Sequence, residues 1–232
     1  MSSGIDDRST LLLGEENVAA LKNKRVAVFG LGGVGGTCFE ALVRSGVGHL
    51  CAIDRDVVDE SNLNRQLLFT AENVGSKKAG AAFLRAKSIR LDVEVLSECY
   101  SVSEETLKEH DYSACDYLVD AMDDIPAKMA LIDYALAHNI PLLISLGMGN
   151  RLDPSKVRLC RLDKTEGDPL AKKLRSELRK KGVDLKKVTA VVSDEIPLVR
   201  GKKPASLMMV PSAAGLLLAS SVLKSLLNLS AK

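Results

Sequence analysis

The chain has 232 residues, of which 46% are hydrophobic, 27% charged and only 3% aromatic. These proportions are typical of a soluble globular protein and exclude a disordered or fibrous one, and the length favours one α/β domain with an elaborated end. The five cysteines form no CxxC pair. This excludes a paired-cysteine zinc site and a thioredoxin-like motif, and it suits a reducing cytosol.

The net charge of +2 conceals a strong asymmetry along the chain. Residues 1–150 carry 14 basic and 22 acidic side chains, whereas residues 151–203 carry 16 basic and 8 acidic ones. A basic stretch on an otherwise acidic chain predicts a polyanionic partner.

The N-terminus has no signal-peptide pattern, so we expect a cytoplasmic protein. Residues 205–223 carry no charge over 19 positions and approach the length of a membrane span. Pro211, Gly215 and several serines make this segment a poor span, and no membrane span is expected. The sequence instead predicts a short strand at Leu207–Val210, followed by a core-facing helix with Ser212 as its cap.

The first half of the chain predicts a parallel sheet. Arg25–Phe29 is an apolar, β-branched run that stops at glycine, His49–Ile53 repeats this pattern, and Val34–Ser45 between them has the length of a helix. This order forms a βαβ unit, for which a right-handed crossover is expected. Later segments continue the alternation: strands at Val93–Leu96, Tyr117–Val119, Pro141–Leu146 and Val157–Leu159, and helices at Ser76–Ile89 and Ala127–Ala137.

The plan changes near residue 151, where a basic helix, Pro169–Lys181, lies in a polar segment. We therefore predict a Rossmann-like, doubly wound, mostly parallel α/β sheet with a C-terminal basic excursion and a final helix. The whole chain is expected to form a single nucleotide-binding domain. Its expected parts are a nucleotide-binding core (1–150), a basic insertion (151–203) and a closing strand and helix (204–232).

A glycine-rich loop follows the first predicted strand and opens the helix after it. Its glycines are Gly30, Gly32, Gly33 and Gly35. Glycines permit a tight turn and bring backbone N–H groups close to a phosphate at the helix N-terminus. Asp54, at the end of the second strand, is placed to accept hydrogen bonds from ribose hydroxyls. The alternative is that the glycines serve only helix–sheet packing.

A polar block after the second strand distinguishes between two classes of nucleotide-binding enzyme. It reads DRD at 54–56 and SNLNRQ at 61–66. Arg65 offers a planar fork for phosphate oxygens, and Lys78 offers a point charge. Solvated polarity at a helix start is the alternative for each. A nicotinamide-dependent oxidoreductase would use only the glycine loop and Asp54, so the block favours phosphate chemistry.

Three carboxylates follow the fourth predicted strand: Asp120, Asp123 and Asp124. The carboxyl ends of parallel strands lie over the ligand crevice, and oxygen ligands beside a triphosphate predict Mg²⁺. We expect Asp123 to bind the metal and Asp120 to orient it. Asp124 either joins them or caps the helix that Pro126 helps to start.

This set of motifs resembles the adenylating family of ubiquitin-activating enzymes and the bacterial activators of sulfur-carrier proteins. The motifs GLGGVG, DRD, SNLNRQ, GSKK and DAMDD carry the resemblance over about residues 8–150. It implies a homodimer in which Arg8 reaches the neighbouring site, with Arg8, Arg65, Lys78 and Asp123 as catalytic residues. The residues expected to contact ATP or Mg²⁺ are Gly30, Gly32, Gly33, Gly35, Asp54, Asp56, Ser61, Asn62, Asn64, Arg65, Lys78, Asp123 and Asp124.

The region after residue 150 points to a narrower branch. The zinc cysteines of the sulfur-carrier activators are missing, and RLDPSK at 151–156 and GDPLAK at 167–172 resemble the tRNA threonylcarbamoyladenosine dehydratases. That resemblance implies ATP-dependent adenylation of the threonyl carboxylate in tRNA and cyclisation to an oxazolone with loss of AMP. It leaves open whether a sulfurtransferase acts as an accessory protein. The alternative is an activator of a small carrier protein that ends in Gly-Gly.

The predicted basic helix is a candidate tRNA-binding surface. By the three-and-four spacing of a helix, Lys172, Arg175 and Arg179 share one stripe. A second stripe is apolar and consists of Leu170, Leu174 and Leu178. The apolar stripe is expected to pack on the core and the basic stripe to contact phosphates. A merely solvated basic helix is the alternative.

Overall fold

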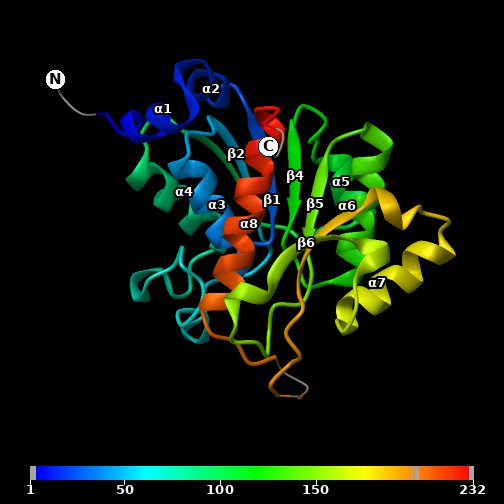
Figure 1. Cartoon of the computed structure of the whole chain (residues 1–232). Helices are drawn as coiled ribbons and strands as arrows, with labels where there is room; N and C mark the ends of the chain where they lie inside the picture. Colours follow the sequence, from blue (N-terminus) through cyan, green and yellow to red (C-terminus); the bar gives the residue numbers. More distant parts are fainter. Residues whose placement is uncertain (1–3, 200, 202–203, 230–232) are drawn as a thin grey trace.

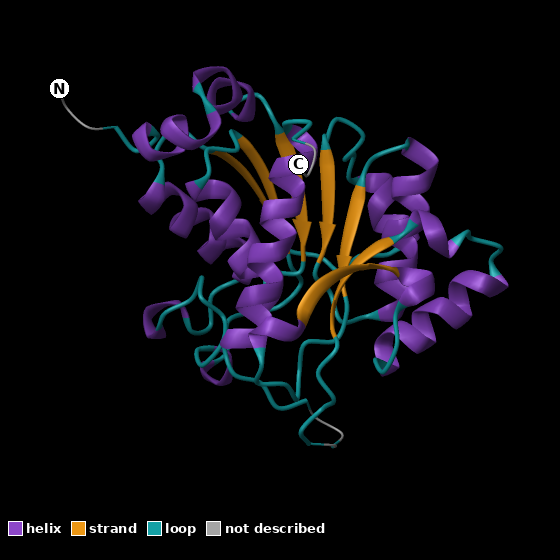
Figure 2. Ribbon diagram, viewed as in Figure 1, coloured by secondary structure: helices purple, strands orange, loops and turns teal. Residues whose placement is uncertain are grey.

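The structure is a computed structural model in which residues 4–199, 201 and 204–229 are described. Its centre is a seven-stranded sheet with helices on both faces (Figures 1 and 2). The strands are β1 (Arg25–Phe29), β2 (His49–Ile53), β3 (Glu94–Glu98), β4 (Tyr117–Asp120), β5 (Leu142–Ser145), β6 (Val157–Arg161) and β7 (Thr189–Ser193). Their order is β3-β2-β1-β4-β5-β7-β6, and every neighbouring pair is parallel except β6 and β7. This is the predicted doubly wound arrangement.

Helices cover both faces because the strand side chains alternate between them. Their bounds are α1 (Asp7–Leu13), α2 (Glu15–Leu21), α3 (Gly33–Arg44), α4 (Lys78–Ile89), α5 (Glu104–Glu109), α6 (Ile125–His138), α7 (Pro169–Lys180) and α8 (Met209–Leu226). On β1, Val26 and Val28 pack in one buried cluster with α3, α4 and α8. Ala27 and Phe29 pack on the opposite face with α5 and α6. The central strands are therefore apolar on both sides.

The basic segment leaves the sheet and returns to it. Helix α7 is fixed by Leu174 and Leu178, both fully buried in a cluster with side chains of α6, β5 and β7. The predicted apolar stripe is thus confirmed at these two positions. Strand β7, which the sequence analysis did not predict, then pairs with β5 and β6. Residues 151–203 consequently supply two strands of the central sheet.

The predicted strand at Leu207–Val210 is wrong. Helix α8 begins at Met209, its N-cap is Met208, and Ser212 lies inside the helix rather than capping it. Proline has the fixed φ and missing N–H that suit the first turn of a helix, so Pro211 favours this earlier start. Met209 and Val210 of the predicted strand therefore form the first turn of the helix, and Leu207 and Met208 precede it.

Helix α8 crosses the sheet beside α3 (Figure 1). The two helices approach closely, since a Cβ atom on Gly215 would lie 2.4 Å from the Val34 carbonyl oxygen. By length and composition alone, α8 is apolar enough to cross a membrane. Ala214, Leu218 and Val222 are nevertheless buried in the cluster shared with the sheet. In this fold α8 is a core helix.

Candidate functional site

A cavity of about 430 Å³ opens where the parallel strands end. The strand arrows in Figure 2 point to this end of the molecule, where the long loops gather. The cavity brings together most of the residues predicted to bind nucleotide. Those that line it are Gly30, Gly32, Gly33, Asp54, Asp56, Asn62, Arg65, Lys78, Asp123 and Asp124.

The glycine loop passes close to the backbone after β4. Gly30 has a φ of +87°, and a Cβ atom there would lie 2.8 Å from the Ala121 carbonyl oxygen, so a larger residue is excluded. Gly35 does not line the cavity, in contrast to the prediction. A Cβ at Gly35 would lie 1.8 Å from the Gly30 carbonyl oxygen, so this glycine serves the contact between helix and loop.

Asp54 joins the end of β2 to the glycine loop. Its Oδ2 accepts a hydrogen bond from the Leu31 N–H at 2.6 Å, and its Oδ1 accepts one from the Asp56 N–H at 2.8 Å. Burial raises the pKa of this carboxyl above its usual range, although Lys78 and these backbone donors oppose the shift. Asp54 therefore shapes the loop as well as lining the cavity.

Lys78 brings a buried positive charge to the cavity. It is the first residue of α4, and only 7% of its side chain is exposed. Its Nζ donates a hydrogen bond to Asp56 Oδ2 at 3.0 Å, and its backbone N–H donates to the Asp56 carbonyl at 3.0 Å. A buried ammonium group needs such partners. The pair holds Lys78 in one place at the cavity wall.

Arg65 is oriented by two residues that the sequence analysis placed at the nucleotide. Its Nη1 donates to the Ser61 carbonyl at 2.8 Å and to Asn64 Oδ1 at 2.9 Å. Asn64 in turn donates from Nδ2 to the Ser206 carbonyl at 2.9 Å. Neither Ser61 nor Asn64 lines the cavity. In this structure they hold Arg65, and their direct contact with the nucleotide stays a prediction.

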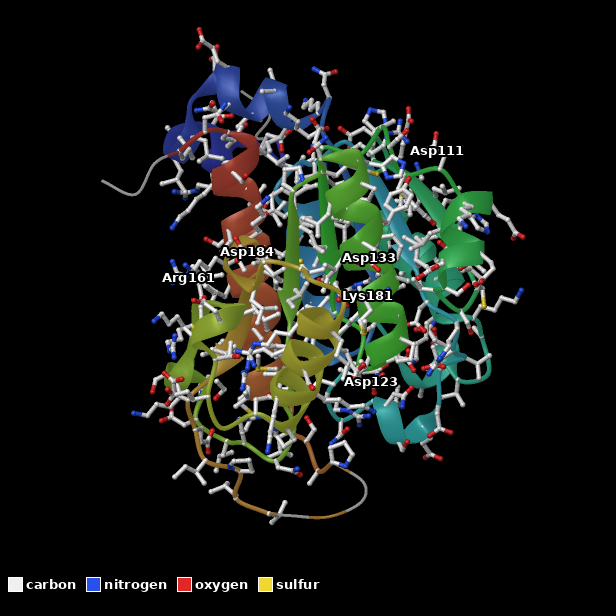
Figure 3. All side chains as sticks on the ribbon, turned by 90° about the vertical axis from the view of Figure 1, so that its right-hand side faces the viewer. Asp111, Asp123, Asp133, Arg161, Lys181 and Asp184 are labelled. Carbon is white, nitrogen blue, oxygen red and sulfur yellow. The ribbon has the colours of Figure 1, made fainter. Side chains whose placement is uncertain are left out.

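The carboxylates after β4 have different surroundings. Asp123 lies at the strand-end side in Figure 3, lines the cavity and is exposed. Within the described part of the chain it has no hydrogen-bond or ion-pair partner. Asp124 accepts a hydrogen bond from the Ala127 N–H at 2.9 Å and caps α6. The capping role of Asp124 is thus confirmed, and it leaves Asp123 as the free carboxylate.

Asp120 is fully buried and does not line the cavity. Its Oδ1 accepts hydrogen bonds from Lys128 Nζ at 3.0 Å and from the Met122 N–H at 3.0 Å. Burial raises the pKa of this carboxyl, while Lys128 opposes the shift. The prediction that Asp120 orients a metal is therefore corrected. This residue instead fixes the start of the loop that carries Asp123.

A metal ion would find few ligands from the protein alone. Among the described residues no group of three or more His, Cys, Asp or Glu side chains is placed to hold one. Mg²⁺ commonly takes one or two carboxylates and completes its shell with phosphate oxygens and water. The carboxylate of Asp123, which has no partner among the described residues, fits such a shared site.

Much of the remaining cavity wall consists of residues that were not predicted to bind nucleotide. Tyr100 and Val102 follow β3. Ser145, the last residue of β5, also lines the cavity, together with residues 146–149 of the loop after it. Gln66 is also buried at the cavity, and its Oε1 has no hydrogen-bond partner among the described residues. Gln66 belonged to the SNLNRQ block, and the glycines at 147 and 149 were visible as a further strand-end signal.

Two groups of predicted residues lie away from the cavity. Arg8 is exposed on α1 and does not line the cavity of its own chain. On α7, Lys172 and Arg179 are exposed, but Arg175 is half-buried and donates to the Thr165 carbonyl at 2.7 Å and to its hydroxyl. The predicted basic stripe is corrected at Arg175, which is bound to its own chain.

This chain is similar to known proteins in both sequence and fold. The model of the ThiF family matches residues 7–232. The tRNA threonylcarbamoyladenosine dehydratase of Bacillus subtilis is 38% identical over 239 residues, covering 95% of this chain and 94% of that protein. Crystal structures of the Escherichia coli tRNA N6-threonylcarbamoyladenosine dehydratase with AMP and with ATP superpose with TM-scores of 0.91 and 0.90 at 31% identity. They cover 98% and 97% of this chain, and 98% of each crystallised chain.

A second kind of relative matches less of the chain. The sulfur carrier protein ThiS adenylyltransferase of Bacillus subtilis is 36% identical over 140 residues, covering 60% of this chain and 41% of that protein. The similarity to the dehydratases therefore extends through the basic segment and α8, whereas the similarity to the adenylyltransferase does not span the whole chain.

Proposed function

Because the chain belongs to the ThiF family, we propose that it is an ATP-dependent tRNA threonylcarbamoyladenosine dehydratase. The observation that carries this proposal is the cavity that gathers the glycine loop, Arg65, Lys78 and Asp123, in a chain similar to a dehydratase over 95% of its length. The proposed substrates are ATP and tRNA that bears the modified adenosine, and the proposed location is the cytoplasm.

ATP would occupy the part of the cavity at the switch point between β1 and β4. Crevices of this kind place phosphates against the glycine loop and the N-terminus of the following helix. The carboxylates of Asp54 and Asp56 lie where ribose hydroxyls are bound in such folds. Tyr100 and Val102 offer an apolar wall beyond β2 for the base.

The first chemical step makes a poor electrophile reactive. A threonyl carboxylate oxygen attacks the α-phosphorus of ATP, and pyrophosphate leaves. The chain contributes positioning and charge, since Arg65 and Lys78 hold positive groups against the developing negative charge on the phosphates. Their contacts with Asn64 and Asp56 fix both groups before the reaction begins.

The second step closes a ring within the same substrate. The carbamoyl oxygen attacks the activated acyl carbon, AMP leaves with the former carboxylate oxygen, and the carbamoyl nitrogen releases its proton to solvent. The nucleoside thereby loses the elements of water, while ATP has become AMP and pyrophosphate. Because both reacting groups belong to one molecule, the step requires no nucleophile from the protein.

The proposed function includes a Mg²⁺ ion, for which Asp123 is the proposed ligand. This free carboxylate would bind the ion together with phosphate oxygens, whereas Asp120 is committed to Lys128. When bound, the ion supplies positive charge to the phosphates during adenylation. Asp123 is held at the cavity by the loop that Asp120 fixes.

The test is a reaction with defined components. The pure chain is incubated with ATP, Mg²⁺ and modified tRNA, and the nucleoside is followed by mass spectrometry. We expect a loss of about 18 mass units, the mass of one water molecule, with one AMP formed per nucleoside converted. Absence of both products would overturn the proposal. Turnover by the chain alone would also establish that no accessory sulfurtransferase is required.

The partial similarity to the sulfur-carrier adenylyltransferase supports a second candidate, activation of a small protein that ends in Gly-Gly. This function predicts ATP–pyrophosphate exchange that depends on such a carrier and not on tRNA. Exchange stimulated by tRNA alone would reject it.

The homodimer is proposed from the position of Arg8. Its side chain is exposed on α1, next to Leu11 and Leu12, which are 81% and 83% exposed although apolar. Such an apolar helix face suits contact with a second copy. Heterodimers of an Arg8→Ala chain and an Asp123→Ala chain should regain activity, because one of their two sites has both residues. No recovery after verified subunit exchange would reject a shared site.

A further inference from the structure

Two buried charged residues on the far side of the cavity have no part in the proposed reaction. Arg151 and Asp168 have side chains that are only 4% and 3% exposed, and Arg151 Nη2 lies 3.8 Å from Asp168 Oδ2. Burying charged groups is costly unless they are paired and hydrogen-bonded. Their contacts show what each of them holds in place.

Asp168 joins two parts of the molecule that are far apart in the sequence. Its Oδ1 accepts a hydrogen bond from the Ala171 N–H at 2.9 Å and so caps α7. Its Oδ2 accepts one from the Gly147 N–H at 2.9 Å. A Cβ atom at Gly147 would lie 2.7 Å from that same Oδ2, so a side chain there would displace the carboxylate.

Arg151 fixes the same loop through its carbonyl groups. The guanidinium donates to the carbonyls of Gly147 and Gly149, and its Nε donates to the Glu195 carbonyl at 3.0 Å. Both glycines line the cavity. The loop after β5 is therefore held at two kinds of group: Asp168 accepts a hydrogen bond from its N–H at Gly147, and Arg151 donates hydrogen bonds to its carbonyls.

The position of this loop indicates what it faces. The glycine loop and Asp54 occupy the β1–β4 side of the cavity, where phosphates and ribose bind in this kind of fold. The loop after β5 and Leu170, the second residue of α7, line the side that ATP would leave open. Two residues after Leu170, Lys172 is exposed on the surface of α7.

We infer that Asp168 is a positioning residue that sets the cavity wall at Gly147–Gly149 against the reacting carboxylate, in register with α7, the helix predicted to bind tRNA. This inference rests on the proposed function. A single side chain would then transmit the docking of the tRNA on α7 to the place where its modified base reacts. The reacting groups must be held to within about 0.5 Å for efficient chemistry, so loss of this contact should slow turnover.

The contact is tested by Asp168→Ser. Serine retains an oxygen that caps α7 but is too short to bind the Gly147 N–H as well. We expect kcat for dehydration to fall by about tenfold, with the ATP Kd within about twofold of that of the wild type. The matched control is Asp184→Ser, which changes another capping aspartate of the basic segment, one bonded to the Lys186 N–H at 3.0 Å. The control should retain wild-type kcat.

A second variant attacks the same contact from the other side. Gly147→Ala should lower kcat in the wild-type background, because its Cβ displaces the Asp168 carboxylate. In the Asp168→Ser background it should add little, since the obstructing oxygen is gone. Unchanged kcat in Asp168→Ser, fully additive losses, or a parallel loss of ATP affinity would each overturn the inference. A wild-type chain that dehydrates no tRNA would instead refute the proposed function.

Discussion

The two sides of the cavity use the same kinds of residue in different ways. On the β1–β4 side, Asp123 is free and exposed to a ligand. On the β5–α7 side, Asp168 and Arg151 are buried and bind the chain's own backbone. The difference teaches that the cavity separates groups that act on a ligand from groups that hold the wall. Lys78 is also buried but lines the cavity, whereas Asp168 and Arg151 do not, so the position of a charge relative to the cavity, rather than its residue type, decides which role it takes.

The largest effect is expected where the two sides meet, at the buried pair of Lys128 and Asp120. Lys128 Nζ also donates to the Ser145 carbonyl at 2.7 Å, so this lysine links the ends of β4 and β5. Lys128→Met would leave the Asp120 carboxylate buried without its partner. We expect the free energy of unfolding to fall by about 3–5 kcal/mol, measured by urea denaturation.

The control for this prediction replaces both partners with apolar residues. The double variant Lys128→Met with Asp120→Leu should recover most of the lost stability, because no charge is left unpaired. Its turnover should stay low, since the Met122 N–H loses its acceptor and the loop that carries Asp123 is released. Equal instability of the single and double variants would contradict the role assigned to the pair.

The next effect compares two adjacent aspartates. Asp123→Ala should reduce dehydration by at least about 100-fold with an unchanged melting temperature, because a free, exposed carboxylate is removed. Asp124→Ala should do the reverse. It removes the cap of α6 and should cost about 1 kcal/mol of stability with a small effect on turnover. Mass spectrometry and thermal unfolding measure the two effects, and an exchange of the two patterns would reverse the assignment.

The contrast between the two sides also explains what the sequence reveals. Strands β1 and β2 were predicted to the residue, because apolar runs that end at glycine or aspartate are local signals. Strand β7 was missed because it follows a long basic segment and its pairing with β5 is non-local. The short helices α1, α2 and α5 were also missed. The start of α8 was misplaced, since Pro211 overrides the strand propensity before it.

The candidate site shows the same limit. The motif residues were predicted to converge, and most of them line one cavity. The predictions were wrong at Asp120, Gly35 and Arg175 because each of these residues contacts another part of its own chain instead of the cavity or a phosphate. Asp120 pairs with Lys128 on a helix, and Arg175 binds Thr165. Sequence spacing does not reveal such partners, because they depend on how the helices pack against the sheet.

A smaller effect distinguishes free from committed basic residues in the tRNA-binding proposal. Lys172 and Arg179 are exposed and have no ion-pair partner in the described ranges. Replacing both with alanine should flatten the log–log dependence of tRNA affinity on salt by about 0.7–0.9 for each phosphate that is no longer neutralised. ATP affinity should not change. The matched control replaces Arg158 and Arg161, which pair with Asp194 and Asp163 and should alter the slope less.

The slope itself tests the proposal because it counts released counterions. An unchanged slope in the double variant would make α7 an ordinary surface helix. A slope that changes equally in the control pair would place the tRNA across β6 as well. Arg200, Lys202 and Lys203 add charge to this segment but lie outside the described residues.

The smallest effect concerns the attachment of α1, which carries Arg8. Asp6 accepts hydrogen bonds from Arg90 at 2.6 and 2.9 Å, and these hold the pKa of Asp6 below its usual value of 3.8. A lowered pKa means that the charged carboxylate stabilises the fold above about pH 3.8 and that this contribution is lost as the pH falls through the lowered pKa. Asp6→Asn should cost about 1 kcal/mol at about pH 7. The stabilities of the variant and the wild type should converge once the pH falls below the lowered pKa of Asp6, as measured by thermal unfolding. The control Asp7→Asn, at the exposed neighbouring position, should cost less stability at about pH 7. A difference between Asp6→Asn and the wild type that persists after the Asp6 carboxylate is protonated would show that the ion pair with Arg90 is not its source.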